Sequence, residues 1–299
     1  MEDKQPVTRA DVTLAEVASV IARAADLATG QPLDHVVRSC AIASLFAEHL
    51  GIAPDERTAT YWVSLLMISG CSAVSFEMSQ LFGDDIELRA GGYQLGPSQI
   101  EMARYVFGRA GGDAPLGTKT RVRLQLLGTR LRPFIETVLA HCSVNARLAE
   151  RLGLGSEVRQ ALESSFAQWN GKGVPEGLGG EAIPMSVRVG TLADLVEVAF
   201  REHGGDGAIE IATTWKGISL DPELARRGLR APRDRPRVAH EPGRLQVRVV
   251  GDQLQSLVDL VGPQRSVRGS RQHDVARRVA VDRGKDLRCR RAPGVGELA

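Results

Sequence analysis

A loop rich in glycine and proline constrains this chain more than any other stretch. Residues 166–194 read FAQWNGKGVPEGLGGEAIPMSVRVGTLAD. Glycine permits positive φ angles and close backbone approach, and proline fixes the exits of turns. Around Asp194, after the loop, apolar residues recur at helical spacing. The sequence therefore predicts a structured loop that leads into a helix carrying Asp194.

The residues before this loop have the pattern of amphipathic helices. Residues 1–220 lack alternating β-branched runs and hairpin turns, so we predict an all-α body. We expect helices at residues 13–28, 34–51, 54–73, 100–107 and 122–153, with a dividing loop at 108–117.

Large apolar side chains suggest which face of the first two helices is buried. In the first helix the expected core stripe is Leu14, Val17, Val20, Ile21 and Leu27, with Thr13 as N-cap. In the second it is Val37, Ala41, Ile42, Leu45 and Leu50.

Two segments 102 residues apart resemble each other. Residues 40–52 (CAIASLFAEHLGI) and 142–154 (CSVNARLAERLGL) share Cys, Ala, Glu, Leu and Gly at matching positions. The match indicates either a genuine internal repeat or the common signal by which a helix ends at glycine. The sequence leaves both interpretations open.

The charge changes sign near residue 225. Residues 1–220 hold 20 Lys and Arg against 26 Asp and Glu, whereas residues 221–299 hold 18 against 10. No Phe, Tyr or Trp follows Trp215, and 17 of the 18 late cations are Arg. We therefore predict a helical domain at 1–225 and a disordered, Arg-rich extension at 226–299, which also has the composition of a frameshifted reading of GC-rich DNA.

Cysteine usage and hydropathy bear on location. Four cysteines lie far apart without a CxxC pair, which favours reduced thiols. No apolar run reaches the roughly 18 residues that span a bilayer, and residues 1–12 show no secretory leader. We expect a cytoplasmic protein with no membrane contact.

The loop resembles the signature of HD-GYP domains, a bacterial subfamily of HD-type metal phosphohydrolases. That signature reads approximately HHERWDGSGYPDGLKGEEIP and is followed by a metal-binding Asp. The shared loop positions are Trp169, Gly171, Gly173, Pro175, Gly177, Leu178, Gly180, Glu181, Ile183 and Pro184. The departures are the paired His (Ser165 and Phe166), the Asp after Trp (Asn170) and the Tyr of GYP (Val174).

The resemblance also implies where metal ligands would fall. Three candidates survive, namely His35, His141 and Asp194. The HD dyad falls on Met67 and Ile68, and an earlier Glu falls on Gln31.

Three N and O ligands can hold one zinc-like ion in principle, but they cannot form a bridged multi-metal centre. We expect no catalytic residue and no cofactor beyond, at most, a single divalent metal ion. Each candidate also has a structural interpretation: a first-turn helix residue for His35, a buried hydrogen-bonded side chain for His141, and an ion-paired carboxylate for Asp194, with Arg188 as a potential partner.

The resemblance implies a catalytically degenerate sensing or protein-interaction domain. Asp221–Leu224 (DPEL) is similar to the segment FDPEL that closes the family's domain. The variant with GQP at 30–32 and LLxxxGC at 65–71 resembles the amino-terminal halves of LuxR-type transcriptional regulators, which would bind DNA through a helix-turn-helix not legible here. The alternative is a metal-dependent cyclic di-GMP phosphodiesterase. A nucleic-acid binder driven by the basic extension ranks last.

Overall fold

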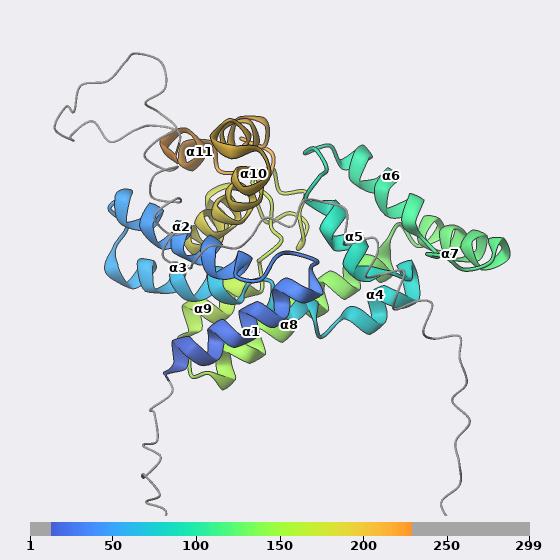
Figure 1. The fold of residues 1–299 in the computed structure, drawn as a ribbon, viewed down its shortest axis with the longest axis horizontal. Coiled ribbons are helices and arrows are strands. Elements are labelled where there is room, and N and C mark those ends of the chain that lie inside the picture. Colours follow the sequence, from blue (N-terminus) through green and yellow to red (C-terminus); the bar gives the residue numbers. More distant parts are fainter. Residues whose placement is uncertain (1–12, 229–299) are drawn as a thin grey trace, which may run out of the picture. The chain divides into compact units, whose positions relative to one another are not determined.

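The computed structural model describes residues 13–228, and within them the chain is helical (Figure 1). The β-structure in this range consists of two isolated bridges, Phe166 with Val174 and Lys216 with Leu220. The predicted all-α architecture is confirmed for this part of the chain.

Eleven α-helices and two short 3₁₀ helices make up the described residues. Their bounds are α1 Leu14–Ala28, α2 His35–His49, α3 Pro54–Leu66, η1 Ser69–Cys71, α4 Ser75–Phe82, α5 Asp85–Gly92, α6 Gln99–Arg109, α7 Leu116–Gly128, α8 Arg132–Arg151, α9 Ser156–Leu162, η2 Gly180–Ala182, α10 Met185–Thr214 and α11 Pro222–Gly228.

The long helix α10 is the centre of the fold. It packs against α2 and α3, which also pack against each other, while α1 covers α2, α3 and η1. Helices α8 and α9, which pack against each other, complete this main core. Helices α4 to α7 share a separate hydrophobic cluster around Phe82 and Leu126 on the right of Figure 1. α10 itself bends at Gly204, whose φ is 67°.

Helix α1 buries the opposite face from the one that its large side chains suggest. Its start is as predicted, because Thr13 and Glu16 form a reciprocal capping box. Its core face, however, consists of Ala18, Ala22 and Ala25 together with Asp26. The expected stripe was wrong: Val20 is 65% exposed and Leu27 61%. Small alanines allow α1 to approach α2 and α3 closely, and this contact outweighs the burial of the larger residues.

Helix α2 repeats this pattern. Its buried apolar face is Val36, Cys40, Ala43 and Ala47, whereas the predicted Leu45 is exposed. The adjacent helices α1 and α2 therefore pack through small side chains rather than through leucines.

The third and fourth predicted helices need different bounds. Helix α3 ends at Leu66 rather than 73, because the chain turns through Ile68 into η1. Helices α4 and α5 lie where no helix was predicted, and the fourth predicted helix is α6. The single helix predicted at 122–153 was wrong, because the chain there forms two helices, α7 and α8.

The two similar segments end their helices in the same way. In α2, Gly51 has φ 69° and Ile52 N–H bonds to the Ala47 carbonyl. In α8, Gly153 has φ 72° and Leu154 N–H bonds to Ala149. The residues that the two segments share thus form the same C-terminal helix motif in α2 and in α8.

The remaining sequence predictions concern residues beyond the described range. The predicted boundary at 225 falls inside α11, and the prediction for 226–299 lies outside the described residues apart from the end of that helix. Among residues 13–228, no single helix is long and apolar enough to cross a membrane, although the bent pair Pro54–Cys71 and Ser75–Phe82 would pass by length and composition.

Candidate functional site

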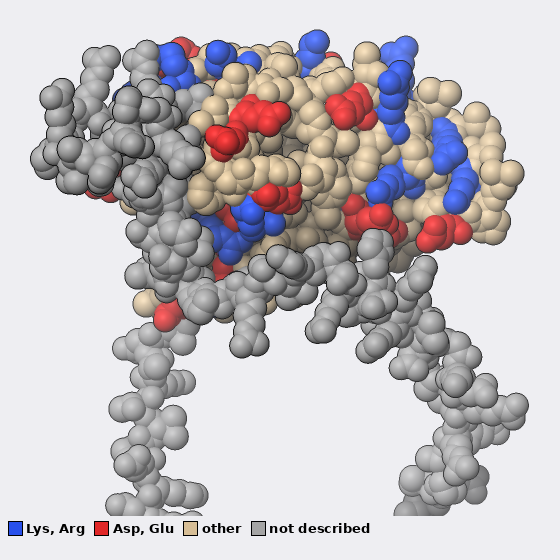
Figure 2. Space-filling view, turned by 45° about the horizontal axis from the view of Figure 1, so that its top comes forward, with Lys and Arg blue, Asp and Glu red and all other residues tan. Residues whose placement is uncertain are grey.

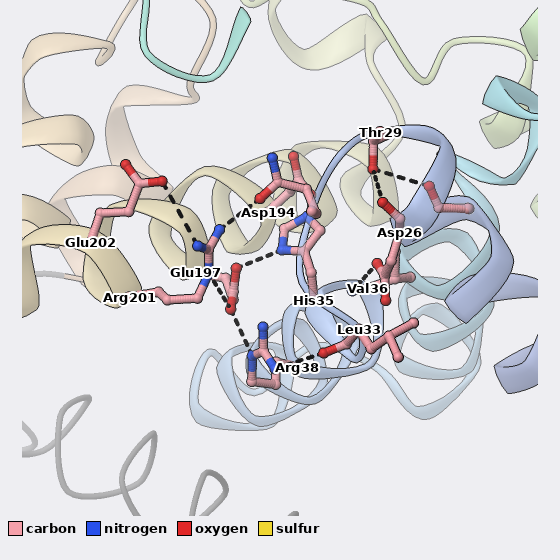
Figure 3. A network of polar contacts seen from close by, with 12 residues as sticks. Asp26, Thr29, Leu33, His35, Val36, Arg38, Asp194, Glu197, Arg201 and Glu202 are labelled. Atoms are coloured by element: carbon pink, nitrogen blue, oxygen red, sulfur yellow. Dashed lines mark hydrogen bonds and ion pairs between the residues drawn. The ribbon is translucent and has the colours of Figure 1, made fainter. Parts of the chain in front are cut away.

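His35 and Asp194 meet across the interface of α2 and α10 (Figure 3). His35 begins α2 and is fully buried, and its Nε2 lies 3.0 Å from Asp194 Oδ1. The Asp194 side chain is 15% exposed. Two of the three predicted candidates are therefore neighbours, although they lie 159 positions apart in sequence.

The other imidazole nitrogen of His35 is held by Glu197, a residue that the sequence did not single out. Nδ1 lies 2.5 Å from Glu197 Oε2, and Glu197 is buried. Burial alone would lower the pKa of His35, but the hydrogen bonds to Asp194 and Glu197 outweigh it and raise that pKa to about 9. His35 is therefore an imidazolium held between two carboxylates.

Two arginines complete the charge balance around Glu197. Arg38 Nε lies 2.7 Å from Glu197 Oε1, and Arg201 Nε lies 3.5 Å from the same oxygen. Burial would raise the pKa of Glu197, but His35 and these arginines together lower it. Arg201 also donates to Gln31 Oε1 at 2.6 Å, which ties the α1–α2 turn to α10.

A second buried carboxylate fixes the start of α2. Asp26 is fully buried at the end of α1, and its Oδ1 accepts the Val36 N–H at 3.0 Å. Burial raises the pKa of Asp26 to about 6, despite that hydrogen bond. Asp26 supplies the cap that Asp34 does not, since the Asp34 side chain instead pairs with Arg23.

Tyr93 packs against the pair. Its ring meets the His35 ring edge to face, with 5.8 Å between centroids. Burial raises the pKa of Tyr93 well above its ordinary value, and Asp194, which accepts its hydroxyl hydrogen bond, raises it further. The phenol therefore stays protonated and donates to Asp194.

His141, the third candidate, has different partners. Its Nε2 donates to the Met67 carbonyl at 2.8 Å, and Asn145 Nδ2 donates to the same oxygen at 2.7 Å. Its ring packs against Phe166 at 4.9 Å. Burial lowers the pKa of His141 to about 4, so this imidazole is neutral. Its contacts are those of a hydrogen-bonded core residue.

The positions where the family resemblance places the dyad and the paired His carry no ligand chemistry. Met67 and Ile68 are buried among apolar side chains, and the Ser165 hydroxyl donates to the Leu162 carbonyl. Gly70 leaves no room for a side chain, since a Cβ there would lie 2.5 Å from the His141 carbonyl.

The donor set does not fit a bridged multi-metal centre. Such a centre needs a carboxylate shared between metals and several neutral imidazoles. Within residues 13–228, no three His, Cys, Asp or Glu side chains form a group that could hold a metal ion. His35 and Asp194 provide two donors, and these contact each other directly at 3.0 Å.

The signature loop folds back on itself and on the turn that follows α10. Asn170 N–H bonds to the Ile218 carbonyl at 2.9 Å, and its Oδ1 accepts the Lys172 N–H. Gly173 is sterically required, because a Cβ would lie 2.3 Å from the Phe166 carbonyl oxygen. Trp169 lies beside Arg188, whose guanidinium carbon is 5.9 Å from the ring centroid, and the Val174–Pro175 peptide bond is cis. Gly171 has φ 73°, so all five signature positions contribute to the shape of the loop.

Arg188 does not pair with Asp194. It forms a buried ion pair of 2.7 Å with Asp221, the first residue of the DPEL segment. Asp221 Oδ1 also caps α11 by accepting the Glu223 N–H at 2.8 Å. The matched residues of the loop and of DPEL therefore stabilise one another.

A groove of about 230 Å³ adjoins the His35 network. It runs between residues 93–97 and α10, and its walls include Tyr93, Leu195, Glu202 and Trp215. Glu202 is bridged to Gln94 at 2.7 Å. The groove thus shares Tyr93 with the network and offers apolar and carboxylate surface to a ligand.

Comparisons with known proteins agree with the fold. No protein-family model matches the chain. It is 26% identical over 212 residues to the 3′3′-cGAMP-specific phosphodiesterase 3 of Vibrio cholerae, an alignment that covers 71% of this chain and 46% of that protein. The crystal structure of a V. cholerae cyclic GMP-AMP-specific phosphodiesterase (V-cGAP3) matches with a TM-score of 0.52 at 23% identity, over 89% of this chain and 53% of that one.

These matches confirm the predicted all-α, HD-GYP-like helical fold. The chain spans about half the length of the relatives that it matches.

The sequence did contain a signal for Glu197. Asp194, Glu197 and Arg201 stand at i, i+3 and i+7 on α10, which places three charged side chains on one side of the helix. His35 and Arg38 repeat that spacing on α2. The spacing places these side chains together on one side of each helix, but that the two sides face each other follows only from the packing of α2 against α10.

Proposed function

We propose that residues 13–228 form a non-hydrolytic, HD-GYP-like regulatory module that senses a ligand or binds a partner protein in bacterial signalling or transcription regulation. The observation that carries this proposal is the His35 network. Both ring nitrogens of His35 are engaged by carboxylates, and Glu197 is in turn engaged by Arg38. Both ring nitrogens are already engaged in this arrangement, so a metal ion could bind His35 only by displacing its contact with one of these carboxylates.

The apolar dyad positions support the same proposal. Met67 and Ile68 are packed into the main core, so no bridging carboxylate can occupy their place. Without metal activation, water keeps a pKa near its bulk value of about 15.7 and is a weak nucleophile toward a phosphodiester.

The ligand-sensing function would use the groove beside Tyr93. Because Tyr93 contacts both the groove and Asp194, a ligand there can act on the α2–α10 interface. A link to LuxR-type regulation would additionally require a DNA-binding helix-turn-helix outside residues 13–228.

A second candidate is a metal-dependent phosphodiesterase. The 26% identity to a 3′3′-cGAMP-specific phosphodiesterase favours it. So does the position of Glu197, because a carboxylate on one imidazole nitrogen is a common way to orient a histidine whose other nitrogen faces a metal.

Hydrolysis and binding assays separate the two candidates. Purified protein is incubated with 3′3′-cGAMP or cyclic di-GMP and Mn²⁺, Fe²⁺ or Zn²⁺, and the products are separated by chromatography. We expect no turnover. The proposal fails if turnover appears, disappears in Asp194→Asn and persists in Asp206→Asn, an exposed matched change on the same helix. Calorimetric titration with each dinucleotide, without metal, then tests sensing directly.

A further inference from the structure

The segment around α7 has a charge pattern unlike the rest of the described chain. Residues 114–135 contain five basic side chains and no acidic one. They are Lys119, Arg121, Arg123, Arg130 and Arg132. Residues 1–220 as a whole carry more acidic than basic side chains. Figure 2 shows several Lys and Arg side chains at its right-hand end, with Asp and Glu beside them, over the region where Figure 1 shows α6 and α7.

Helix α7 is held to the body by one narrow edge. Leu126 is its one fully buried residue, and Val122, one turn earlier, packs partly against the same cluster. The remaining turns of this 13-residue helix face away from the core.

The exposed side of α7 is apolar along its centre. Leu116, Leu124 and Leu127 are 78%, 63% and 65% exposed. At 3.6 residues per turn, these leucines and Thr120 fall within about 80° of one another around the helix axis. They form a leucine stripe that includes Thr120, whereas isolated exposed leucines are ordinary.

Basic residues border this leucine stripe on both sides. Lys119 and Arg123 follow one edge, and Arg121 follows the other. Arg123 donates to the Gly108 carbonyl at 3.0 Å. Within residues 13–228 no acidic side chain lies within ion-pair distance of these three cations, although Arg132 further along pairs with Glu136.

We propose that α7 is a surface-docking helix for an anionic lipid bilayer. Lying in the plane of the membrane, it would insert the leucine stripe at the boundary of the acyl chains and place its bordering cations among anionic headgroups. The expectation of no membrane contact came from the lack of a spanning segment, and a helix lying on the surface needs none.

Charge complementarity favours an anionic bilayer over a second copy of the chain and over a nucleic acid. A second copy of the chain would bring the same cations face to face across the stripe, with no acidic side chain to balance them. A nucleic acid would neutralise the cations but leave the leucines in water, and α7 carries no aromatic side chain to stack on bases.

Vesicle sedimentation tests the proposal with the full chain. Vesicles are made of phosphatidylcholine alone or with about one third phosphatidylglycerol. We expect binding to the anionic vesicles, and at least a tenfold loss of partitioning in the double variant Leu124→Asn/Leu127→Asn. The matched control is Val20→Asn/Leu27→Asn on α1, whose side chains are equally exposed (65% and 61%) but lie on a helix with acidic residues as well as Arg23.

The control variant should bind like the unchanged protein. Because residues 229–299 are the same in all variants, their basic charge contributes an equal background. Equal binding of both double variants, or equal binding to vesicles without phosphatidylglycerol, would refute the proposal. Self-association that Leu124→Asn/Leu127→Asn abolishes, with no vesicle binding, would instead identify the stripe as a protein interface and also refute it.

Discussion

The two buried histidines among residues 13–228 differ in charge, since one is protonated and the other is neutral. His35 and His141 are both almost inaccessible to water, at 0% and 2% exposed. Burial penalises the charged imidazole in each place, yet the pKa of His35 is raised to about 9 while that of His141 is lowered to about 4. Partners, rather than burial, decide the difference.

Those partners come from different kinds of interface. At α2 and α10, each helix contributes charged side chains, so His35 faces Asp194 and Glu197. At α8 and the turn after α3, His141 faces the Met67 carbonyl and Asn145. The first interface is an ion network and the second is a neutral hydrogen-bonded contact. Histidines that the family resemblance assigns to one metal centre therefore have two unrelated structural roles here.

Removing Glu197 should have the largest effect on the free energy of unfolding, because it disrupts the charged interface around His35. Glu197→Ala leaves His35 and Arg38 buried without their shared carboxylate, a loss that typically costs about 3–5 kcal/mol. Urea unfolding measures the change in free energy. Glu210→Ala on an exposed face of the same helix should change it by less than about 0.5 kcal/mol. Equal effects of both variants would contradict the buried network.

Alkaline pH should weaken the charged interface alone. A histidine whose folded pKa is raised stabilises the fold fully below its unfolded pKa of about 6.5, and this stabilisation is lost as pH rises toward 9. The expected loss between those values is about 3 kcal/mol, since each pKa unit corresponds to roughly 1.4 kcal/mol.

Chemical denaturation at a series of pH values measures this slope, and Glu197→Gln should flatten it. His141 should contribute only on the acid side, where stability is lost as pH falls from 6.5 toward 4. The raised pKa of Asp26 acts in the opposite direction between about pH 6 and 4. A flat profile from pH 6.5 to 9 in the unchanged protein would contradict the His35 assignment.

Truncating Asn145 should have a smaller effect at the neutral interface. Asn145→Ala removes one of two donors to the Met67 carbonyl, and His141 remains as the other. We expect a loss of about 1–3 kcal/mol in the free energy of unfolding, without any change in the slope above pH 6.5. A changed alkaline slope would mean that the two histidines are coupled.

Arg201→Ala should have the smallest effect. Its side chain is 27% exposed and lies 3.5 Å from Glu197, so solvent screens the pair and Arg38 still balances the carboxylate. The expected cost is about 0–1 kcal/mol by thermal or chemical unfolding. A cost comparable to that of Glu197→Ala would place Arg201, rather than Arg38, at the centre of the network.

Local signals in the sequence predicted helix ends better than helix faces. The capping box at Thr13 and the glycines at 51 and 153 depend on residues close in sequence, and the structure has helix ends at all three. The buried faces of α1 and α2 depend on how closely neighbouring helices approach. That distance is set by alanines such as Ala22 and Ala43, which a search for large apolar residues passes over.

The candidate site could be predicted only in part, because part of it depends on which helices pack together. The loop resemblance selected His35 and Asp194, which the fold brings together. It also selected His141, which has separate partners, and it missed Glu197, because a carboxylate on a helix is ordinarily a solvated residue. Only the pairing of α2 with α10 shows that Glu197 is buried against His35.

The side-chain nitrogens of His35 provide the most direct test of the account. Two-dimensional ¹H–¹⁵N NMR of the full chain at pH 7.5, with His35→Gln for assignment, reports the protonation of each imidazole nitrogen. We predict that both nitrogens of His35 carry a proton, that His141 is neutral, and that an equivalent of Zn²⁺ leaves the His35 signals in place. A neutral His35 whose Nε2 lacks a proton and shifts on addition of Zn²⁺ would contradict the ion network and favour a metal site.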